Sequence, residues 1–396
     1  MPTTFAELGV SESVAGALAS RNISSPFDIQ AMVMQDALAG ADILASSRTG
    51  SGKTLAFAIP IVERLMHTNN RVSALVLVPT RELASQVATE FEIIGKARGL
   101  RVAAVYGGVS IPAQAKRAAK AHILVATPGR LEDLANQKLI SLNQVEVLVL
   151  DEADRMLDMG FQPQIQAIVR RLPTERQTMF FSATLDGDIG RLARSYTKDP
   201  KRHNVESPAP TVDEAEHRFI SVNHREKTEE LLKHLADEEG RRLVFVRTKR
   251  GADRLAGKLK TRGIKAAAMH GDMTQGAREK ALRAFTAGQI DTLVATDVAA
   301  RGIDLDDISH VINYDPPDDH KSYIHRVGRT ARAGRSGIGI TFVMADQQGD
   351  VSRIASILKL KEQFEAAGMT VAPPRLAYTS GKGRKNMMRR RPRRGF

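Results

Sequence analysis

The chain has 396 residues, of which 42% are hydrophobic and 26% charged, and this composition is typical of a globular protein rather than a disordered one. Its length exceeds one ordinary hydrophobic core, so two domains are expected. It contains no cysteine, which excludes disulfides, thiolate metal sites and cysteine nucleophiles and suits a cytoplasmic protein. No apolar run approaches the roughly 20 residues that cross a bilayer, and the N-terminus lacks a secretory pattern, so no membrane partner is expected.

The net charge of +13 is unevenly distributed. The last sixteen residues carry eight Lys or Arg and no acid, which leaves +5 for residues 1–380. Such a tail either solubilises the protein or binds polyanions by counterion release. With no Trp and five Tyr, the chain is poorly equipped to stack many bases, so any nucleic acid should be held by its phosphate–sugar backbone.

Apolar runs typical of buried parallel strands alternate with helical patterns, which predicts two α/β domains with parallel sheets. The strand-like runs of the first part are ADILAS (41–46), SALVLVP (73–79), RVAAVYGG (101–108), AHILVATP (121–128), VEVLVLDE (145–152) and QTMFFSAT (177–184). Those of the second part are RRLVFV (241–246), IKAAAMH (264–270), DTLVATD (291–297), HVINYD (310–315) and IGITFVM (338–344). The predicted division is a first domain over 1–205, a linker over 206–216, a second domain over 217–366 and a disordered basic tail over 367–396.

The first strand leads into a Gly-containing loop and then a helix, the arrangement of a P-loop. The loop is TGSGKT, which comprises Thr49, Gly50, Ser51, Gly52, Lys53 and Thr54. Its backbone N–H groups and the following helix N-terminus favour phosphate, Lys53 can reach the β- and γ-phosphates, and Thr54 can ligate Mg²⁺. One departure is Ser47, which stands where the full P-loop pattern has Gly, and a Gly-rich turn is the alternative interpretation.

Three carboxylates follow the strand-like run that ends at residue 150. Asp151, Glu152 and Asp154 would repel one another unless a cation lies among them. Beside a P-loop, Asp151 is expected to hold Mg²⁺, partly through water, and Glu152 to polarise the attacking water as general base. The alternative is acidic residues that only favour a helix N-terminus.

These motifs resemble those of the DEAD-box RNA helicases of superfamily 2, in the family's order. They are TGSGKT (49–54), PTRELA (79–84), GG (107–108), TPGR (127–130), DEAD (151–154), SAT (182–184), HGDMTQGAR (270–278), ATDVAARGID (295–304) and HRVGRTAR (325–332). The resemblance runs from about Phe5 to residue 345 and is greatest to small bacterial generalist members. It implies two RecA-like domains that bind ATP and RNA in the cleft between them.

The resemblance also implies an adenine site, with an isolated aromatic at Phe5 and a carboxamide at Gln30 that can pair with the base. The chain departs from the family pattern here, because Asn22 and Ile23 replace Gly and an aromatic, and Phe27 replaces Thr. Ile23 could cover the base by apolar contact but cannot stack as a ring. Asp304 is expected to accept a hydrogen bond from the ribose of ATP.

The motif HRVGRTAR is expected to supply the second domain's part of the ATP site. The resemblance casts Arg329 and Arg332 as arginine fingers on the γ-phosphate. The resemblance also implies that His325 and Arg326 contact the acidic motif and sense closure. The alternative is that these residues form a basic helix face that binds solvent or RNA. Coupling within the first domain is expected from Ser182 and Thr184, which could bond Asp154, although SAT could also be a simple strand cap.

The RNA-facing set follows from motif position and consists of hydroxyl, glycine and arginine residues suited to phosphate. Its members are Pro79, Thr80, Arg81, Gly108, Thr127, Gly129, Arg130, Arg247, Thr248, Gly271, Arg278 and Thr296.

The predicted function is that of an RNA-dependent ATPase, active as a monomer, that closes two domains on ATP and RNA and locally unwinds short duplexes. An ATP-gated RNA clamp or annealing scaffold is the first alternative, and a DNA helicase or metabolic P-loop NTPase is the second. The pathway stays open, with ribosomal and RNA-decay assemblies as the candidate partners.

Overall fold

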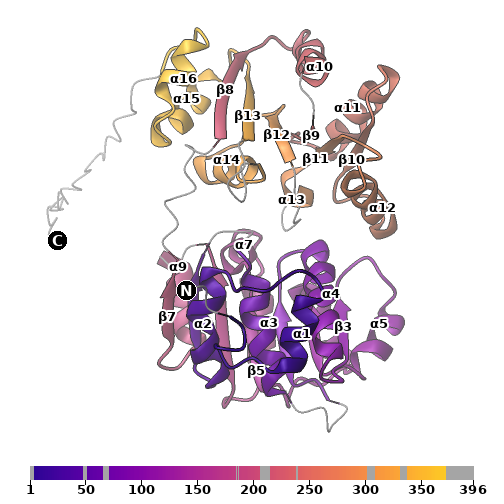
Figure 1. Cartoon of the computed structure of the whole chain (residues 1–396). Coiled ribbons are helices and arrows are strands. Elements are labelled where there is room, and N and C mark those ends of the chain that lie inside the picture. Colours follow the sequence, from indigo (N-terminus) through magenta and orange to yellow (C-terminus); the bar gives the residue numbers. More distant parts are fainter. Residues whose placement is uncertain are drawn as a thin grey trace, which may run out of the picture.

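The computed structural model describes residues 4–47, 51–65, 71–183, 185, 187–205, 215–237, 240–300, 308–330 and 337–371. They form two α/β lobes, drawn one above the other in Figure 1. Within these ranges, none of the helices has the length and apolar character that a bilayer crossing needs. The predicted disordered tail (367–396) begins too early, because Met369 is buried in the apolar core of the second lobe; from 372 onward the tail lies outside the described residues.

The first lobe is built on a seven-stranded parallel sheet in the order β3-β4-β2-β5-β6-β1-β7. The strands are β1 (Ile43–Ser46), β2 (Ala74–Leu77), β3 (Val102–Val105), β4 (Ile123–Ala126), β5 (Val147–Leu150), β6 (Gln177–Ser182) and β7 (Lys201–Asn204). The helices are α1 (Glu12–Ala19), α2 (Asp28–Leu38), α3 (Lys53–Arg64), α4 (Arg81–Lys96), α5 (Ile111–Ala118), α6 (Pro128–Asn136), α7 (Ala153–Asp158), α8 (Gln162–Val169) and α9 (Gly187–Tyr196).

Helices cover both faces of this sheet, which is why its strands β2, β4 and β5 are apolar at every position. Consecutive residues of one strand, such as Val76 and Leu77, point to opposite faces and belong to different apolar clusters. The cluster on one face includes side chains of α1 to α4, and the cluster on the other includes side chains of α5 to α9. All four residues of β2, β4 and β5 are buried, as expected for doubly covered parallel strands.

The second lobe is built on a six-stranded parallel sheet in the order β10-β11-β9-β12-β13-β8. The strands are β8 (Ala215–Ser221), β9 (Arg241–Phe245), β10 (Ala266–Met269), β11 (Thr292–Ala295), β12 (Ile308–Asn313) and β13 (Gly337–Val343). The helices are α10 (Lys227–Asp237), α11 (Lys249–Thr261), α12 (Gln275–Thr286), α13 (Asp297–Ala300), α14 (His320–Val327), α15 (Gln348–Ile357) and α16 (Lys361–Ala366). Helices α10 and α11 pack on one face, and α12 to α16 on the other.

Two of the four edge strands, β7 and β8, were not predicted. An edge strand need not be apolar throughout: β7 reads KRHN and none of its residues is fully buried, while β8 alternates buried Ala215, His217 and Phe219 with less buried residues. Because β8 begins at Ala215, the second lobe starts two residues before the predicted boundary.

Because all strands of each sheet are parallel, their carboxyl ends lie at one edge, where ligands bind in open α/β folds. The P-loop follows β1, DEAD follows β5 and SAT overlaps the end of β6. In Figure 1, α7, which continues from DEAD, lies at the side of the first lobe that faces α13 and α14 of the second.

Candidate active site and RNA-facing surface

The P-loop is closed by contacts that its own sequence supplies. Lys53, the first residue of α3, donates from Nζ to the Ser47 carbonyl oxygen over 2.8 Å. The Ser47 and Ser51 hydroxyls are 2.9 Å apart and bonded across the loop. The serine that replaces the usual glycine therefore bridges the two ends of the loop. Thr49 and Gly50 lie outside the described residues.

Gln30 supports the P-loop from α2. It is fully buried; its Nε2 donates to the Gly52 carbonyl over 2.9 Å, and its Oε1 accepts from the Phe27 N–H over 3.0 Å. Gly52 has φ +83°, and a Cβ there would lie 2.5 Å from Gln30 Nε2, so this position requires glycine. The carboxamide expected to read adenine is thus engaged at both ends by the protein.

The other two residues expected to contact the base pack against the apolar core of the first lobe. Phe5 is only 3% exposed and packs in the apolar core of the first lobe. Ile23 is half-buried against the same cluster. The structure therefore contradicts Phe5 as a ring that faces a nucleotide, because an upstream aromatic in this short N-terminal segment gains more by joining the core.

The acidic motif lies buried beside Lys53. Burial raises the pKa of Asp151 to about 7, against the opposing effect of Lys53 and together with the neighbouring carboxylates. Burial alone would also raise the pKa of Glu152, but Arg155, Lys53 and Arg329 hold it below its ordinary value. Three cations thus lie near these carboxylates, and together they favour the charged form of Glu152, the form in which a carboxylate can act as a general base.

Arg155 is a site residue that the sequence reasoning missed. Its Nη1 lies 2.8 Å from Glu152 Oε2, and both side chains are buried. Glu152 itself has left-handed backbone angles (φ +51°, ψ +48°), which are uncommon for a residue other than glycine. The spacing of three residues across the start of α7 was the available signal, and the pair fixes the direction of the Glu152 carboxylate.

Asp154 bonds to the SAT motif, but through the backbone. Its Oδ2 accepts from the Ala183 N–H over 3.3 Å, and its Oδ1 accepts from the Arg155 N–H over 3.0 Å. The buried Ser182 lies at the end of β6, and Thr184 lies outside the described residues. A connection between DEAD and SAT is therefore present through the main chain of Ala183.

The donors suit Mg²⁺ bound with a nucleotide rather than a metal held by protein alone. Among the described residues, no group of three or more His, Cys, Asp or Glu side chains could hold a metal ion. Mg²⁺ usually takes one or two carboxylates together with phosphate oxygens and water. Asp151 and the half-buried Thr54 hydroxyl at the start of α3 provide such a partial set.

Helix α14 brings basic residues of the second lobe to this site. Arg329, just after α14, is close enough to Glu152 to lower the pKa of that carboxylate. Burial, helped by Arg155 and Arg329, lowers the pKa of His325 to about 4, although Asp154 and Glu152 act in the opposite direction. Arg329 and His325 therefore face the acidic motif across the two lobes. Arg332 and Asp304 lie outside the described residues.

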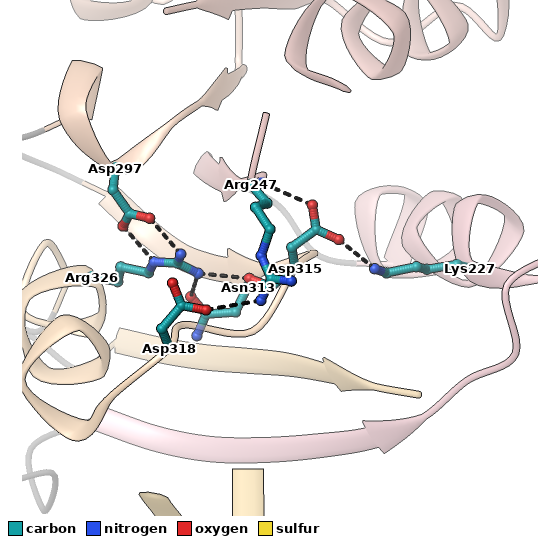
Figure 2. Close-up of polar contacts among 7 residues, drawn as sticks. All are labelled: Lys227, Arg247, Asp297, Asn313, Asp315, Asp318 and Arg326. Carbon is teal, nitrogen blue, oxygen red and sulfur yellow. Dashed lines mark hydrogen bonds and ion pairs between the residues drawn. The ribbon is translucent and has the colours of Figure 1, made fainter. Parts of the chain in front are cut away.

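Arg326 does not contact the acidic motif, contrary to the expectation. Figure 2 shows its guanidinium held within the second lobe, where Nε and Nη2 each donate to Asp297 over 2.6 Å. Its Nη1 donates to Asn313 Oδ1 (3.1 Å) and to the Asp315 carbonyl (2.6 Å). Neighbouring residues on a helix point in different directions, so His325 faces the first lobe while Arg326 anchors α14 to its own sheet.

The same network continues to the loop after β9. Asp315 accepts from Lys227 Nζ over 2.6 Å and from the Arg247 N–H over 2.8 Å, and Arg247 Nη2 reaches Asp318 over 2.9 Å (Figure 2). The Arg247 side chain is still exposed. One chain of polar contacts thus links an expected RNA-facing residue to the anchor of the helix that carries His325.

The expected RNA-facing residues fall into exposed and structural groups. The exposed ones are Gly108, Arg247, Thr248 and Gly271, the half-buried ones Arg81, Gly129 and Arg130, and the buried ones Pro79, Thr80, Thr127, Thr296 and Arg278. The Thr80 and Thr248 hydroxyls cap α4 and α11. These helix starts lie at the carboxyl edges of their sheets, where backbone amides can meet phosphate.

Three arginines of this set make protein contacts that sequence could not reveal. Arg130 donates from Nη1 to the Val109 carbonyl over 2.8 Å. The Arg81 guanidinium lies against Gly108, where φ is +83° and a Cβ would collide with it. Arg278 is buried and lies 3.0 Å from Glu82 of the first lobe, which contradicts its expected role as an accessible RNA contact.

Comparison with known proteins places these features in a family. Residues 27–192 match the family described as DEAD/DEAH box helicase, and residues 224–334 match that described as helicase conserved C-terminal domain. The DEAD-box ATP-dependent RNA helicase CshA of Geobacillus kaustophilus (strain HTA426) is 43% identical to this chain and aligns with 91% of it and 77% of the relative.

Solved structures agree over nearly the whole chain. S. cerevisiae Dbp5 bound to RNA and ADP BeF3 superposes with a TM-score of 0.80 at 30% identity, covering 91% of this chain and 94% of that one. A DEAD box protein from Methanococcus jannaschii is 39% identical and gives a TM-score of 0.52, covering 90% and 98%. With matches to both domains and a relative this similar over this length, the chain belongs to the DEAD-box family of ATP-dependent RNA helicases.

Proposed function

We propose that this helicase separates short RNA duplexes locally, through closure of its two lobes on ATP and RNA. With the lobes apart, the γ-phosphate would meet the P-loop and Asp151 but not Arg329. Since ATP and RNA would each contact both lobes, each favours the closed state and thereby the binding of the other. Phosphate release then reopens the cleft.

The observation that carries this proposal is a buried ion pair between the lobes. Arg278, in the first turn of α12, lies 3.0 Å from Glu82 in the first turn of α4, and their side chains are 7% and 4% exposed. Two opposite charges lose water here only when the lobes meet, and such a pair is favourable only with good geometry. The likeness to Dbp5, whose solved form holds RNA and ADP BeF3, supports the same arrangement.

The small number of nucleotides that the closed lobes would bind explains why short duplexes are the expected substrates. Stacking in DNA-like duplexes contributes about 1.4 kcal/mol per step, so the distortion of a few nucleotides releases a short partner strand and leaves a long one paired. Mg²⁺, held by Asp151, Thr54 and the phosphates, would stabilise the charge that develops on the transferred phosphate. Backbone contacts at the helix starts make the activity independent of RNA sequence.

A double-mutant cycle tests closure. We expect Glu82→Gln and Arg278→Gln each to weaken ATP-dependent RNA binding by about tenfold, within the usual range of coupling between sites. The double variant should be no weaker than either single one, because each change already removes the pair. Fluorescence anisotropy of labelled RNA, with and without ATP, measures the RNA affinity of the wild type, the two single variants and the double variant.

The matched control is the exposed pair Arg262–Glu229, which lies within the second lobe at 2.8 Å. Glu229→Gln should leave ATP-dependent RNA binding unchanged. If the losses of RNA affinity caused by Glu82→Gln and Arg278→Gln were additive, or if neither change lowered the affinity, the contact between these residues would not contribute to closure.

Strand displacement distinguishes unwinding from an ATP-gated clamp or annealing scaffold. We expect ATP to release the labelled strand of a duplex of about ten base pairs and to leave one of about forty base pairs intact, since the second holds roughly four times the stacking energy. RNA-stimulated ATPase without release of the short strand would favour the clamp. Equal stimulation by DNA would contradict recognition of the 2′-OH, on which RNA preference depends here.

A further inference from the structure

Phe27 is a large aromatic side chain left open to solvent. It is 63% exposed, and among the described residues it is the only aromatic one of the five large apolar side chains that face solvent. The other four are Met32, Leu139, Val298 and Ile357. A lone exposed apolar residue needs no explanation in general, so the position of this one decides its meaning.

The ring lies on the P-loop. A Cβ at Gly52 would come within 2.6 Å of Phe27 Cδ2, which places the ring edge directly against the last glycine before Lys53. Phe27 immediately precedes α2, and its N–H donates to Gln30 Oε1 over 3.0 Å. Gln30 in turn donates to the Gly52 carbonyl. These contacts hold the aromatic ring at the mouth of the phosphate loop.

The remaining candidates for contact with a base are buried or half-buried. Phe5 is in the core, Ile23 packs on the same core, and Gln30 is fully buried with both ends of its carboxamide bonded. The flat face of a purine bound beside Gly52 would still need an apolar surface to cover it. An exposed phenyl ring at that point offers the face on which such a surface stacks favourably.

We propose that Phe27 stacks on the base of bound ATP and supplies the aromatic surface that Ile23 lacks. This inference rests on the proposed function, because it takes the P-loop as the ATP site. It makes Phe27 a binding residue that acts on affinity for the nucleotide and not on the chemical step.

The absence of tryptophan from the chain gives a direct optical test. Phe27→Trp introduces the only tryptophan, and we expect ADP to quench its fluorescence in a saturable way while inorganic tripolyphosphate, which has no base, does not. Leu139→Trp is the matched control, since Leu139 is an exposed residue of the same lobe; its fluorescence should not respond to ADP. No response of Phe27→Trp to ADP, or an equal response to tripolyphosphate, would overturn the proposal.

Steady-state kinetics provide the second measurement. We expect Phe27→Thr to raise the KM for ATP by about tenfold, a typical loss for one base–aromatic stack, with kcat at saturating ATP unchanged. The KM of Phe27→Leu, which keeps an apolar side chain without a ring face, should lie between those of the wild type and Phe27→Thr. An unchanged KM in a wild type that shows RNA-stimulated ATPase would refute the role of Phe27 alone. Absence of that ATPase in the wild type would instead refute the proposed function.

Discussion

Replacement of Glu152 by Gln is expected to abolish ATP turnover while leaving ATP-dependent RNA binding intact. A carboxamide cannot accept the proton of the attacking water, and loss of a positioned general base typically costs about 10²- to 10⁴-fold in rate. Gln has the same shape as Glu, and its amide oxygen can still accept from Arg155, which lies 2.8 Å from Glu152 Oε2. Phosphate release under RNA saturation and anisotropy of labelled RNA measure the two properties.

Asp158→Asn provides the control for this change. Asp158 ends the same short helix α7 but is exposed to solvent, so kcat should stay at the wild-type value. Substantial hydrolysis by Glu152→Gln would mean that another group accepts the proton. Loss of RNA binding together with turnover would mean that the Glu152 carboxylate holds the closed state instead of acting as a base.

The residues at the ends of apolar strands were predictable from sequence. A strand that is buried on both faces must read as a continuous apolar run, so β1, β2, β4, β5 and β6 were recognised, and with them the positions of Lys53 and Glu152. The edge strands β7 and β8 lack this signal. Lys201–Asn204 is polar, and Ala215–Ser221 alternates, so both were read as connections between elements.

The partners of charged side chains could not be predicted in the same way. Helical spacing indicates which residues share a face but not what that face meets, and so Arg326 was assigned to the acidic motif although it binds Asp297. Arg278 was assigned to RNA although it meets Glu82, a residue 196 positions earlier in the chain. Contacts between lobes depend on how the lobes are placed, and a sequence pattern within one lobe contains no information about that.

Loss of the Arg329 guanidinium is expected to slow hydrolysis strongly. Arginines that reach a transferring phosphate from another domain contribute about 10³- to 10⁵-fold in comparable enzymes. Arg329 is buried and close enough to Glu152 to hold the pKa of that carboxylate down. The single-turnover rate of Arg329→Ala should therefore fall by this factor, while its affinity for ATP, which depends on the first lobe, changes little.

The conservative variant separates charge from geometry. Arg329→Lys keeps a positive charge near Glu152 but loses the planar fork that contacts two phosphate oxygens at once, so we expect it to recover only a small part of the lost rate. Lys321→Ala, an exposed change on the first turn of α14, should leave hydrolysis unaffected, and thermal melts of all three proteins report whether the fold persists. Near-wild-type hydrolysis by a folded Arg329→Ala would mean that another group stabilises the charge of the transition state. Because the pKa of Glu152 would then rise without an effect on the rate, the proximity of Arg329 to Glu152 would serve packing alone.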